Sequence, residues 1–375
     1  MIELKDFWNI KWSSNAITRW AKYGPYYAMF PIDFAFNVID KHSNIWDNVL
    51  DPFAWRFSSI YASAILWRNA TWIEINPLWW IYWQTKLNPC IKDIILIRLE
   101  EIYALRFKFQ SQANDMWEFY KLCYCNEVLT FLLSARANLG WKDSHIDRTL
   151  MSFILIYLHW KLWEGLSNQM RLTKSMGMNY SINWWKSNNY LVPPEINPLK
   201  LIQKKIEWRY LKWVPEASGE FELFLGDSVD ILKNIKEEKL NKYSLLFTSP
   251  PYCSIVDYHV DQWIRLWMLW WNDSPKTNKD KHKWRFNWKE EYKELLNDVF
   301  GESKYLMKSK STIYVRTDIR EFTFNTTLEV LKKHFPTHKL TIIDQPFLNR
   351  TQTELFNQNI TQFKKRWEID IILES

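Results

Sequence analysis

The 375-residue sequence predicts an α/β protein with a mainly parallel sheet, helices on both faces and a largely helical insert. Two observations carry this prediction. Short apolar runs typical of buried strands alternate with segments of helical periodicity, once near the start of the chain and again near its end. Between these blocks, apolar residues recur at helical spacing in a polar background. We therefore divide the chain into residues 15–90, 91–219 and 220–375.

The first block contains two predicted strands and two predicted helices. A helix over Phe30 to Ile39 precedes a short strand over Asn48 to Leu50. A helix over Ser58 to Leu66 then leads into a strand over Thr71 to Ile75, and Pro77 marks the start of a new segment. This strand–helix–strand order is typical of a parallel sheet.

The middle segment is predicted to be a helical insert, because its apolar positions repeat every three or four residues. From residue 91 to 138 the repeat includes Ile94, Ile95, Leu99, Ile102, Tyr103 and Leu105. Residues 139–219 are more mixed. There, Val192-Pro193-Pro194 and Asn197-Pro198 indicate a linker.

The second block begins near Phe221, where FELFLGDS has the pattern of a strand followed by a turn. A helix over Val229 to Ile235 and a buried strand over Tyr243 to Phe247 come next. The remaining predicted elements are a strand at Thr312–Val315, a helix around Thr326 to His334, and strands at Lys339–Ile343 and Glu368–Leu373. The last two strands have no obvious helix between them, which suggests an antiparallel pair at one edge of the sheet.

Composition limits the class of protein. A net charge of +7 suits a polyanionic partner without identifying one. The four cysteines do not have the spacing of a metal site, and Cys123-x-Cys125 lacks a second pair or a nearby histidine. The first residues do not resemble a signal peptide, and no apolar run approaches the roughly 18 residues of a membrane span. We therefore expect a soluble, cytoplasmic protein without a metal.

The most informative motif is Ser249-Pro250-Pro251-Tyr252, which follows the apolar run from Tyr243 to Thr248. Two consecutive prolines fix the backbone and remove two N–H donors, so neighbouring carbonyls have no ladder partner. A hydroxyl, a carbonyl and an aromatic ring thus gather at the carboxyl end of a strand, where open α/β sheets bind ligands. This combination suits the binding of a planar base that carries an amine.

Together with Asp51-Pro52-Phe53-Ala54 after the first strand, this motif resembles the signature of the amino-group DNA methyltransferases. Members of that family carry a [Ser/Thr/Asp/Asn]-Pro-Pro-[Tyr/Phe] catalytic motif and an Asp-Pro-Phe-x-Gly cofactor motif. The segment Lys22-Tyr23-Gly24-Pro25-Tyr26-Tyr27 is similar to the one that precedes the cofactor loop. The resemblance covers nearly the whole chain except the insert. It implies a Rossmann-like methyltransferase fold that uses S-adenosyl-L-methionine to methylate N4 of cytosine or N6 of adenine.

The resemblance also implies roles for single residues. Ser249 and the Pro250 carbonyl would accept hydrogen bonds from the target amine, with Pro251 fixing the turn and Tyr252 stacking on a flipped base. The predicted cofactor-binding residues are Tyr26, Asp51, Pro52, Phe53, Ala54, Trp55, Glu74 and Asp227. Glu74 would accept the ribose hydroxyls, the alternative being an exposed carboxylate at a strand end. Asp227 would reach the adenine or the base pocket, or else belong to an ordinary turn.

The implied substrate is double-stranded DNA, and serine at position 249 favours N4-cytosine over N6-adenine. Residues 91–219 fall where one family subgroup has its target-recognition region, and a cognate restriction endonuclease is an expected partner. The basic stretches Lys276 to Lys289 and Lys204 to Lys212 are candidates for phosphate contact, or solvated faces. Alternatives are an RNA or protein-amide methyltransferase, or a non-catalytic nucleic-acid-binding protein with the same fold.

One departure from the family pattern is Trp55, which stands where the cofactor loop needs glycine so that the backbone can turn tightly. The anomaly extends over the chain, which has 25 tryptophans and only 7 glycines. Several tryptophans occupy positions typical of glycine, including Trp46, Trp67, Trp72 and the doublet Trp270-Trp271. We hypothesise that the gene uses UGA for glycine and that these codons were translated as tryptophan. The alternative is a protein truly rich in tryptophan, which UGG codons at Trp55, Trp67 and Trp72 would indicate.

Overall fold

The computed structural model divides into two compact units. The sheet unit comprises Tyr27–Trp80, Glu216–Asp257 and Lys279–Ser375, and the helical unit comprises Met1–Tyr26, Ile81–Pro215 and Tyr258–Asn278. The residues that the structure describes are 16–24, 32–54, 58–172, 174–254, 258–270, 288–344 and 368–375.

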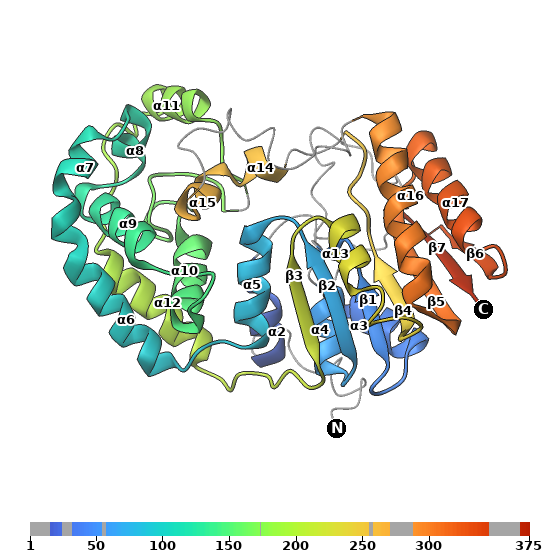
Figure 1. The fold of residues 1–375 in the computed structure, drawn as a ribbon. Helices are drawn as coiled ribbons and strands as arrows, with labels where there is room; N and C mark the ends of the chain where they lie inside the picture. Colours follow the sequence, from blue (N-terminus) through green and yellow to red (C-terminus); the bar gives the residue numbers. More distant parts are fainter. Residues whose placement is uncertain are drawn as a thin grey trace. The chain divides into compact units, whose positions relative to one another are not determined.

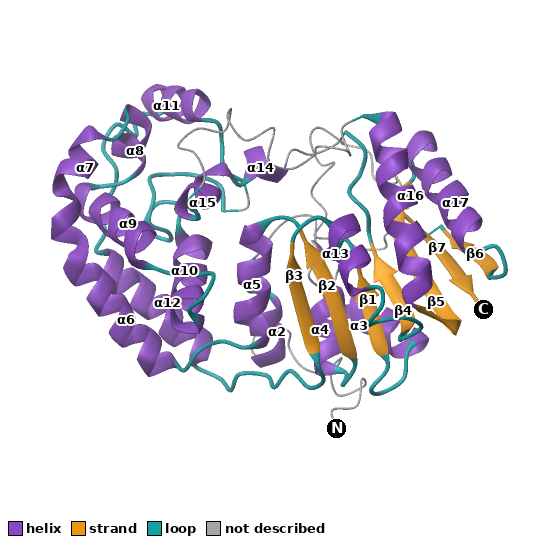
Figure 2. Ribbon diagram, viewed as in Figure 1, coloured by secondary structure: helices purple, strands orange, loops and turns teal. Residues whose placement is uncertain are grey.

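The sheet unit is built on a seven-stranded sheet of order β3-β2-β1-β4-β5-β7-β6 (Figures 1 and 2). Its strands are β1 (Asn48–Asp51), β2 (Asn69–Glu74), β3 (Phe221–Leu225), β4 (Tyr243–Thr248), β5 (Met307–Asp318), β6 (Lys339–Ile343) and β7 (Glu368–Glu374). Neighbours from β3 to β5 pair in parallel, whereas β7 runs antiparallel to both β5 and β6. The predicted α/β class, the mainly parallel sheet and the antiparallel edge are confirmed. The reversed strand is that of the methyltransferase fold implied by the resemblance.

The strand order reverses direction between β1 and β4. From β1 the chain moves outward through β2 to β3, and from β4 it moves the other way through β5. The two central strands are in register at Leu50 and Leu246, so their carboxyl ends lie side by side. In open α/β sheets such a switch point is where ligands bind. Asp51 and Ser249 therefore lie at the edge of the sheet where a ligand is expected to bind.

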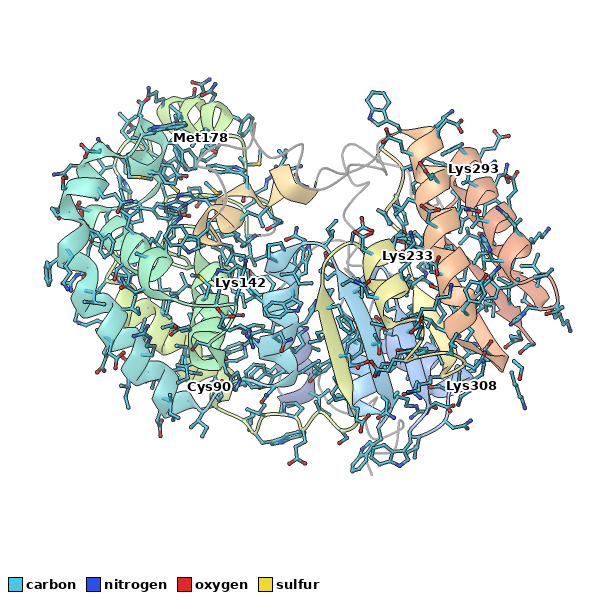
Figure 3. The ribbon with its side chains drawn as sticks, viewed as in Figure 1. Cys90, Lys142, Met178, Lys233, Lys293 and Lys308 are labelled. Carbon is cyan, nitrogen blue, oxygen red and sulfur yellow. The ribbon has the colours of Figure 1, made fainter. Side chains whose placement is uncertain are left out.

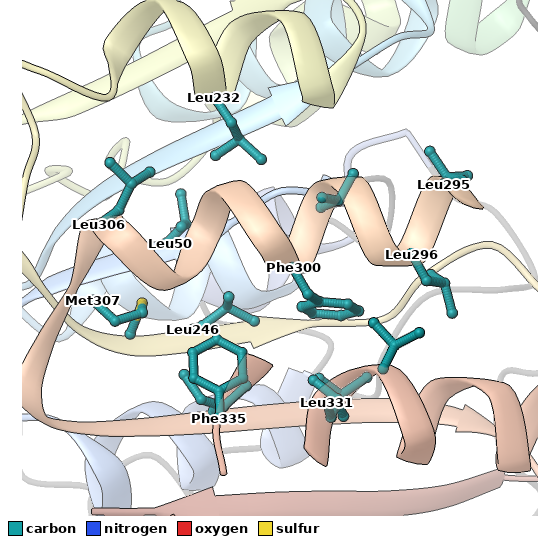
Figure 4. Close-up of a cluster of buried hydrophobic side chains, with 14 of the residues drawn as sticks. Leu50, Leu232, Leu246, Leu295, Leu296, Phe300, Leu306, Met307, Leu331 and Phe335 are labelled. Carbon is teal, nitrogen blue, oxygen red and sulfur yellow. The ribbon is translucent and has the colours of Figure 1, made fainter. Parts of the chain in front are cut away.

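Helices cover both faces of this sheet. They are α3 (Ile32–His42), α4 (Ser58–Ile65), α13 (Ser228–Ile235), α16 (Lys289–Leu306) and α17 (Glu321–His334). On one face, Leu232 of α13, Phe300 of α16 and Leu331 of α17 share a buried cluster with Leu50 and Leu246 (Figure 4). Helices on both faces of the sheet agree with the prediction from the sequence.

On the other face, aromatic rings of α3 and the central strands meet. Phe34 lies 5.9 Å from both Phe247 and Tyr314, measured between ring centroids. Phe247 follows Leu246 in β4, so their side chains point to opposite faces as the strand period requires. Apolar side chains therefore pack on both faces of the central strands.

The helical unit confirms a largely helical insert. Its helices are α2 (Ala16–Ala21), α6 (Lys92–Ala104), the 3₁₀ helix η2 (Leu105–Phe109), α7 (Gln110–Asp115), α8 (Glu118–Cys123), α9 (Asn126–Asn138), α10 (His145–Tyr157), α11 (Met178–Ser187), α12 (Pro198–Tyr210), α14 (Tyr258–Asp261) and α15 (Trp263–Met268). Asn197-Pro198, expected as part of a linker, instead starts α12. The Asn197 side chain accepts from the Lys200 N–H, and Pro198 occupies the first turn. None of the described helices is long and apolar enough to cross a membrane.

Several helices outside the predicted insert were not predicted, and two of them are longer than ten residues. Helix α5 (Pro77–Leu87) follows β2, and Pro77 at its first position is typical of a helix start. Helix α16 buries Tyr292, Leu296, Val299 and Phe300 along one stripe. Charged residues occupy many of the positions between these apolar residues, and they obscure the helical periodicity in the sequence.

Among the residues that the structure describes, four tryptophans adopt the left-handed backbone conformation. Trp46, Trp67, Trp163 and Trp270 have φ values of 67°, 63°, 66° and 70°. This region suits glycine, and a bulky side chain there is uncommon because its Cβ crowds the backbone. Trp72, which the sequence grouped with them, is different: it lies inside β2, fully buried, with its ring stacked on Phe221.

Candidate functional site

Asp51, the last residue of β1, organises the edge of the sheet at the switch point. Its side chain is 1% exposed. Asp51 Oδ1 accepts from Thr248 Oγ1 at 2.6 Å and from the Phe53 N–H at 3.2 Å, while Oδ2 accepts from Ser59 Oγ at 2.7 Å. A buried carboxylate needs such donors, because removal from water is costly without them. One carboxylate thus joins the Asp-Pro-Phe loop, helix α4 and the end of β4.

The bond from Thr248 brings the two sequence motifs together. Thr248 ends β4 and directly precedes Ser249, which is 1% exposed. Pro250 is also buried and Pro251 is half-buried. Because the carboxyl ends of parallel strands meet at one edge, the Asp-Pro-Phe loop and the Ser-Pro-Pro-Tyr turn are neighbours.

The start of α13 closes the same edge from the other side. Ser228 Oγ donates to the Pro52 carbonyl at 2.6 Å. Asp227 is the N-cap of α13, and its Oδ1 accepts from the Val229 N–H at 2.9 Å. This cap is the ordinary-turn role that the sequence left open for Asp227. Asp227 is adjacent in sequence to Ser228, whose hydroxyl contacts Pro52.

Glu74 ends β2, next to β1, and is 4% exposed. Its Oε1 accepts from the Asn76 N–H at 2.7 Å, and the Gly226 N–H donates to its main-chain carbonyl at 2.9 Å. Burial raises the pKa of the Glu74 carboxyl to about 8, and the negative charge of Asp51 adds to this shift. The carboxyl is therefore not an exposed strand-end group. It is a buried acceptor whose ionised form needs further donors.

Tyr252 ends the Ser-Pro-Pro-Tyr turn and is 1% exposed. Its hydroxyl donates to Glu368 Oε1 at 2.6 Å. On the next residue, the Cys253 carbonyl accepts from Arg320 Nη2 at 2.7 Å, and Arg320 is paired with Asp318 at the end of β5. The downstream half of the turn is thus held by β5 and β7.

Arg316, near the carboxyl end of β5, has an internal role in the structure. It is 2% exposed and forms a bidentate pair with Asp370 at 2.5 and 2.7 Å. A guanidinium used in this way is not presented to a phosphate. In the stretch Lys204 to Lys212, Arg209 is likewise buried, and its Nη1 donates to the Arg19 carbonyl.

Part of the predicted site lies outside the described residues. This is true of Tyr26, of Trp55 and of almost all of the basic stretch Lys276 to Lys289. Among the described cofactor candidates, Pro52 and Ala54 are buried and Phe53 is half-buried. Phe53 packs on Phe300 of α16, with 6.3 Å between ring centroids.

The structure adds residues that the sequence did not single out: Ser59, Thr248, Glu368 and Arg320. Thr248 adjoins a recognised motif, so its position could have been noticed. Glu368 is separated from Tyr252 by 116 residues, and no local pattern indicates that pairing.

All four cysteines are free and buried, among them Cys90 of the helical unit, labelled in Figure 3. Burial raises the pKa of the Cys123 thiol, which disfavours the thiolate that binds metals. In the part of the chain that the structure describes, no cluster of histidine, cysteine and acidic residues has the geometry of a metal site.

Comparison with known proteins gives a limited result. No family model matches the sequence, and no curated protein matches it. Among solved structures, one match is the crystal structure of SMU.776, a candidate methyltransferase complexed with SAH, at 13% identity. The match covers 48% of this chain and 37% of that one, with a TM-score of 0.24. A likeness this distant decides neither the fold nor the function, which rest on the topology and the residues described above.

Proposed function

We propose that the protein is a site-specific DNA methyltransferase that transfers a methyl group from S-adenosyl-L-methionine to an exocyclic base amine. The observation that carries this proposal is the 2.6 Å bond between Asp51 and Thr248. It couples the residues that resemble a cofactor loop directly to those that resemble the catalytic turn. Both motifs lie at the switch point of a mainly parallel sheet, where such ligands are expected.

The described residues fit S-adenosyl-L-methionine by the chemistry of their acceptors. Glu74, at the end of the strand next to the Asp-Pro-Phe loop, would accept the ribose hydroxyls. The backbone from Phe53 onward would hold the methionine part, with Asp51 keeping that loop in place. When bound, the cofactor supplies an electrophilic methyl group on a sulfonium. Within this proposal Tyr26 and Trp55, or the glycine that we expect at 55, complete the binding residues.

The target amine is a poor nucleophile because its lone pair is delocalised into the base. Acceptors aimed at its two protons favour the tetrahedral form of the nitrogen, in which the lone pair is available. Ser249 Oγ and the Pro250 carbonyl would be these acceptors. Their burial strengthens the effect, because hydrogen bonds act more strongly away from water. No metal or nucleophilic cysteine enters this mechanism.

Serine at position 249 favours N4-cytosine over N6-adenine as the target. Duplex DNA with a flipped base is the proposed partner, with residues 91–219 as the target-recognition region and a cognate restriction endonuclease as a further partner. We propose a cytoplasmic location, where DNA and reduced thiols coexist. RNA or protein-amide methylation and non-catalytic nucleic-acid binding are the competing functions.

The experiment that separates these functions supplies cofactor labelled in the methyl group to the protein carrying glycine at position 55. Duplex DNA, single-stranded RNA and a mixture of proteins are offered in parallel. We expect label in DNA. Label confined to RNA or protein would show that the substrate is not DNA. Cofactor binding without any transfer would favour the non-catalytic alternative.

The affinity for the cofactor should rise with pH. Glu74, with a pKa of about 8, is mostly protonated at neutral pH, and ribose hydroxyls would stabilise its ionised form. Binding would therefore release a proton, and below pH 8 the Kd should fall by up to about tenfold for each pH unit. Titration calorimetry from pH 6 to 9 measures both the Kd and the proton release.

The matched control is Glu74→Gln, which keeps the shape and one acceptor oxygen but cannot ionise. Its Kd should be nearly independent of pH in this range. If the unaltered protein also shows a flat profile, Glu74 does not bind the ribose as a carboxylate.

A further inference from the structure

We infer that Tyr252 is a positioning residue: its hydroxyl ties the Ser-Pro-Pro-Tyr turn to Glu368 of β7. This inference rests on the proposed function and deepens it. It gives the Tyr252 hydroxyl a role of its own, beside the stacking role that the family resemblance implies for the ring. In that role phenylalanine would serve as well as tyrosine, because only the ring face is used.

The first argument is the burial of both partners. Tyr252 is 1% exposed and Glu368 is 3% exposed, and 2.6 Å separates the hydroxyl oxygen from the carboxylate. A hydrogen bond from a hydroxyl to a carboxylate is strong when water is excluded. Its loss would leave Glu368 with one fewer donor in a buried position, so the bond constrains the turn.

The second argument is that Glu368 is itself held by a rigid group. Arg316 Nη1 lies 3.7 Å from Glu368 Oε2, and Arg316 is fixed by its bidentate pair with Asp370. The guanidinium also lies 3.6 Å from the centre of the Phe34 ring. The Tyr252 hydroxyl therefore connects the turn to a network anchored on two neighbouring strands, β5 and β7.

The third argument is that a second contact holds the turn at the adjacent residue. Arg320 donates to the Cys253 carbonyl, and its partner Asp318 is 1% exposed. The turn is thus held on its upstream side by Thr248 and Asp51, and on its downstream side by Glu368 and Arg320. Because the turn is fixed on both sides, the acceptors of Ser249 and Pro250 would not have to move when the base binds.

The test is Tyr252→Phe, which keeps the ring and removes the hydroxyl. We expect kcat for DNA methylation to fall about tenfold or more, because a bond to a charged group is lost. The KM for DNA and the Kd for the cofactor should stay within about twofold of the original values, since the hydroxyl is bonded to Glu368 and is assigned no contact with either ligand. Glu368→Gln, which keeps an acceptor oxygen, should retain more activity than Glu368→Ala.

Tyr314→Phe is the matched control. Its hydroxyl donates to Asp370 Oδ2 at 2.7 Å in the same buried network, but Tyr314 has no place in the turn. Unchanged activity of Tyr252→Phe would overturn the inference and leave the ring as the only part of Tyr252 with a proposed role. So would an equal loss in both variants, because the effect would then be general destabilisation.

A readout without activity keeps this inference separate from the proposed function. Hydrogen exchange of the amides of residues 252–254 should accelerate in Tyr252→Phe and not in Tyr314→Phe. If exchange responds in this way but no substrate is methylated, the tether stands and the proposed function falls. Equal exchange in both variants would contradict the inference about Tyr252 and would not affect the proposed function.

A second inference rests on the backbone and is independent of the function. We infer that glycine occupies positions 46, 67, 163 and 270 in the natural protein. All four tryptophan side chains are between 44% and 65% exposed, so no core depends on them. Their positive φ angles are the conformation that glycine adopts at no steric cost.

Two of the four positions end helices. After α4, the Arg68 N–H donates to the Ser63 carbonyl and the Trp67 N–H to the Ala64 carbonyl. This is the Schellman motif, and position 67 is the one that glycine normally fills. Trp270 holds the same position after α15, with its N–H donating to the Trp267 carbonyl at 3.1 Å.

The other two positions lie in tight turns. The Asp47 N–H donates to the Asn44 carbonyl, and the Glu164 N–H donates to the Lys161 carbonyl. Trp46 and Trp163 are the third residues of these four-residue turns. A positive φ at the third residue is the reason that glycine prevails there.

Other tryptophans show the opposite features and should be authentic. Trp185 is 1% exposed in α11, and its Nε1 donates to the Gln169 carbonyl at 2.8 Å. Trp263 is 3% exposed in α15, with Nε1 donating to the Met176 carbonyl at 3.0 Å. An indole that is both packed and hydrogen-bonded has no glycine-like role.

Peptide mass spectrometry of the protein purified from its natural source tests this inference. We expect glycine at 46, 67, 163 and 270, with UGA codons, and tryptophan at 185 and 263, with UGG codons. Tryptophan at all six positions would overturn it. In recombinant protein, replacing the four residues with glycine should raise the Tm, whereas Trp185→Gly should lower it; a lower Tm for the fourfold variant would also contradict the inference.

Discussion

Replacement of Ser249 by alanine should reduce kcat for DNA methylation by about 10²–10³ while leaving the Kd for the cofactor unchanged. The serine hydroxyl is proposed to accept one proton of the target amine, so its contribution is made as the nitrogen changes geometry. Ser249 is buried beside Pro250, where water cannot substitute for the missing acceptor. Single-turnover methylation with saturating cofactor measures the effect.

Ser254→Ala is the control for this substitution. Ser254 lies five residues further along, exposed, and is not part of the motif. It should retain nearly full activity. If Ser249→Ala keeps activity within a factor of about three, the hydroxyl is not the acceptor and the catalytic role of the turn has to be abandoned.

Replacement of Asp51 by alanine should destabilise the protein by about 2–4 kcal/mol and weaken cofactor binding more than tenfold. The loss would leave the buried hydroxyls of Thr248 and Ser59 without their acceptor. It would also free the Phe53 N–H and with it the loop that is proposed to hold the cofactor. Urea unfolding and cofactor titration measure the two effects separately.

Asp51→Asn and Asp47→Ala are informative comparisons. Asparagine keeps one acceptor oxygen, so its loss of stability should be smaller than that of alanine. Asp47 precedes the same strand at its amino end and accepts from the exposed Asn44 N–H. Its removal should leave the affinity for the cofactor unchanged. Equal effects at positions 47 and 51 would show that strand β1 is sensitive as a whole and that Asp51 has no special role.

Much of the sheet follows from local sequence. The strand at Lys339–Ile343 is predicted with its observed ends, and most other strands are predicted to within two residues. The exception is β5, of which only the part from Thr312 to Val315 is predicted, whereas the strand runs from Met307 to Asp318. The meeting of the Asp-Pro-Phe loop with the Ser-Pro-Pro-Tyr turn also follows, because both come after buried parallel strands. These predictions succeed because alternating apolar runs and proline turns are local signals.

The contacts that tie the site together could not be predicted in the same way. Tyr252 and Glu368 belong to segments far apart in the chain, and either could equally be solvent-exposed on sequence grounds. Arg316 illustrates the same limit, because an arginine at a strand end suggests phosphate binding until its buried partner Asp370 is seen. Pairing between distant polar residues depends on the fold and leaves no periodicity in the sequence.

The tryptophan anomaly is a case in which sequence and structure support each other. The sequence singled out Trp46, Trp67 and Trp270 from their neighbours, and the structure gives all three positive φ angles. Trp72 was grouped with them by the same reasoning, but it does not have a positive φ angle, because it lies inside strand β2. Trp163 was not singled out, although Gly165 nearby indicates a turn.

The most direct test of the central claim is the identity of the methylated product. Duplex DNA is incubated with cofactor and with protein carrying glycine at positions 46, 55, 67, 163 and 270, then digested to nucleosides and analysed by mass spectrometry. We predict N4-methylcytosine, and its absence from DNA treated with the Ser249→Ala variant. A preparation that binds the cofactor yet produces no methylated exocyclic amine in any DNA sequence would contradict the account.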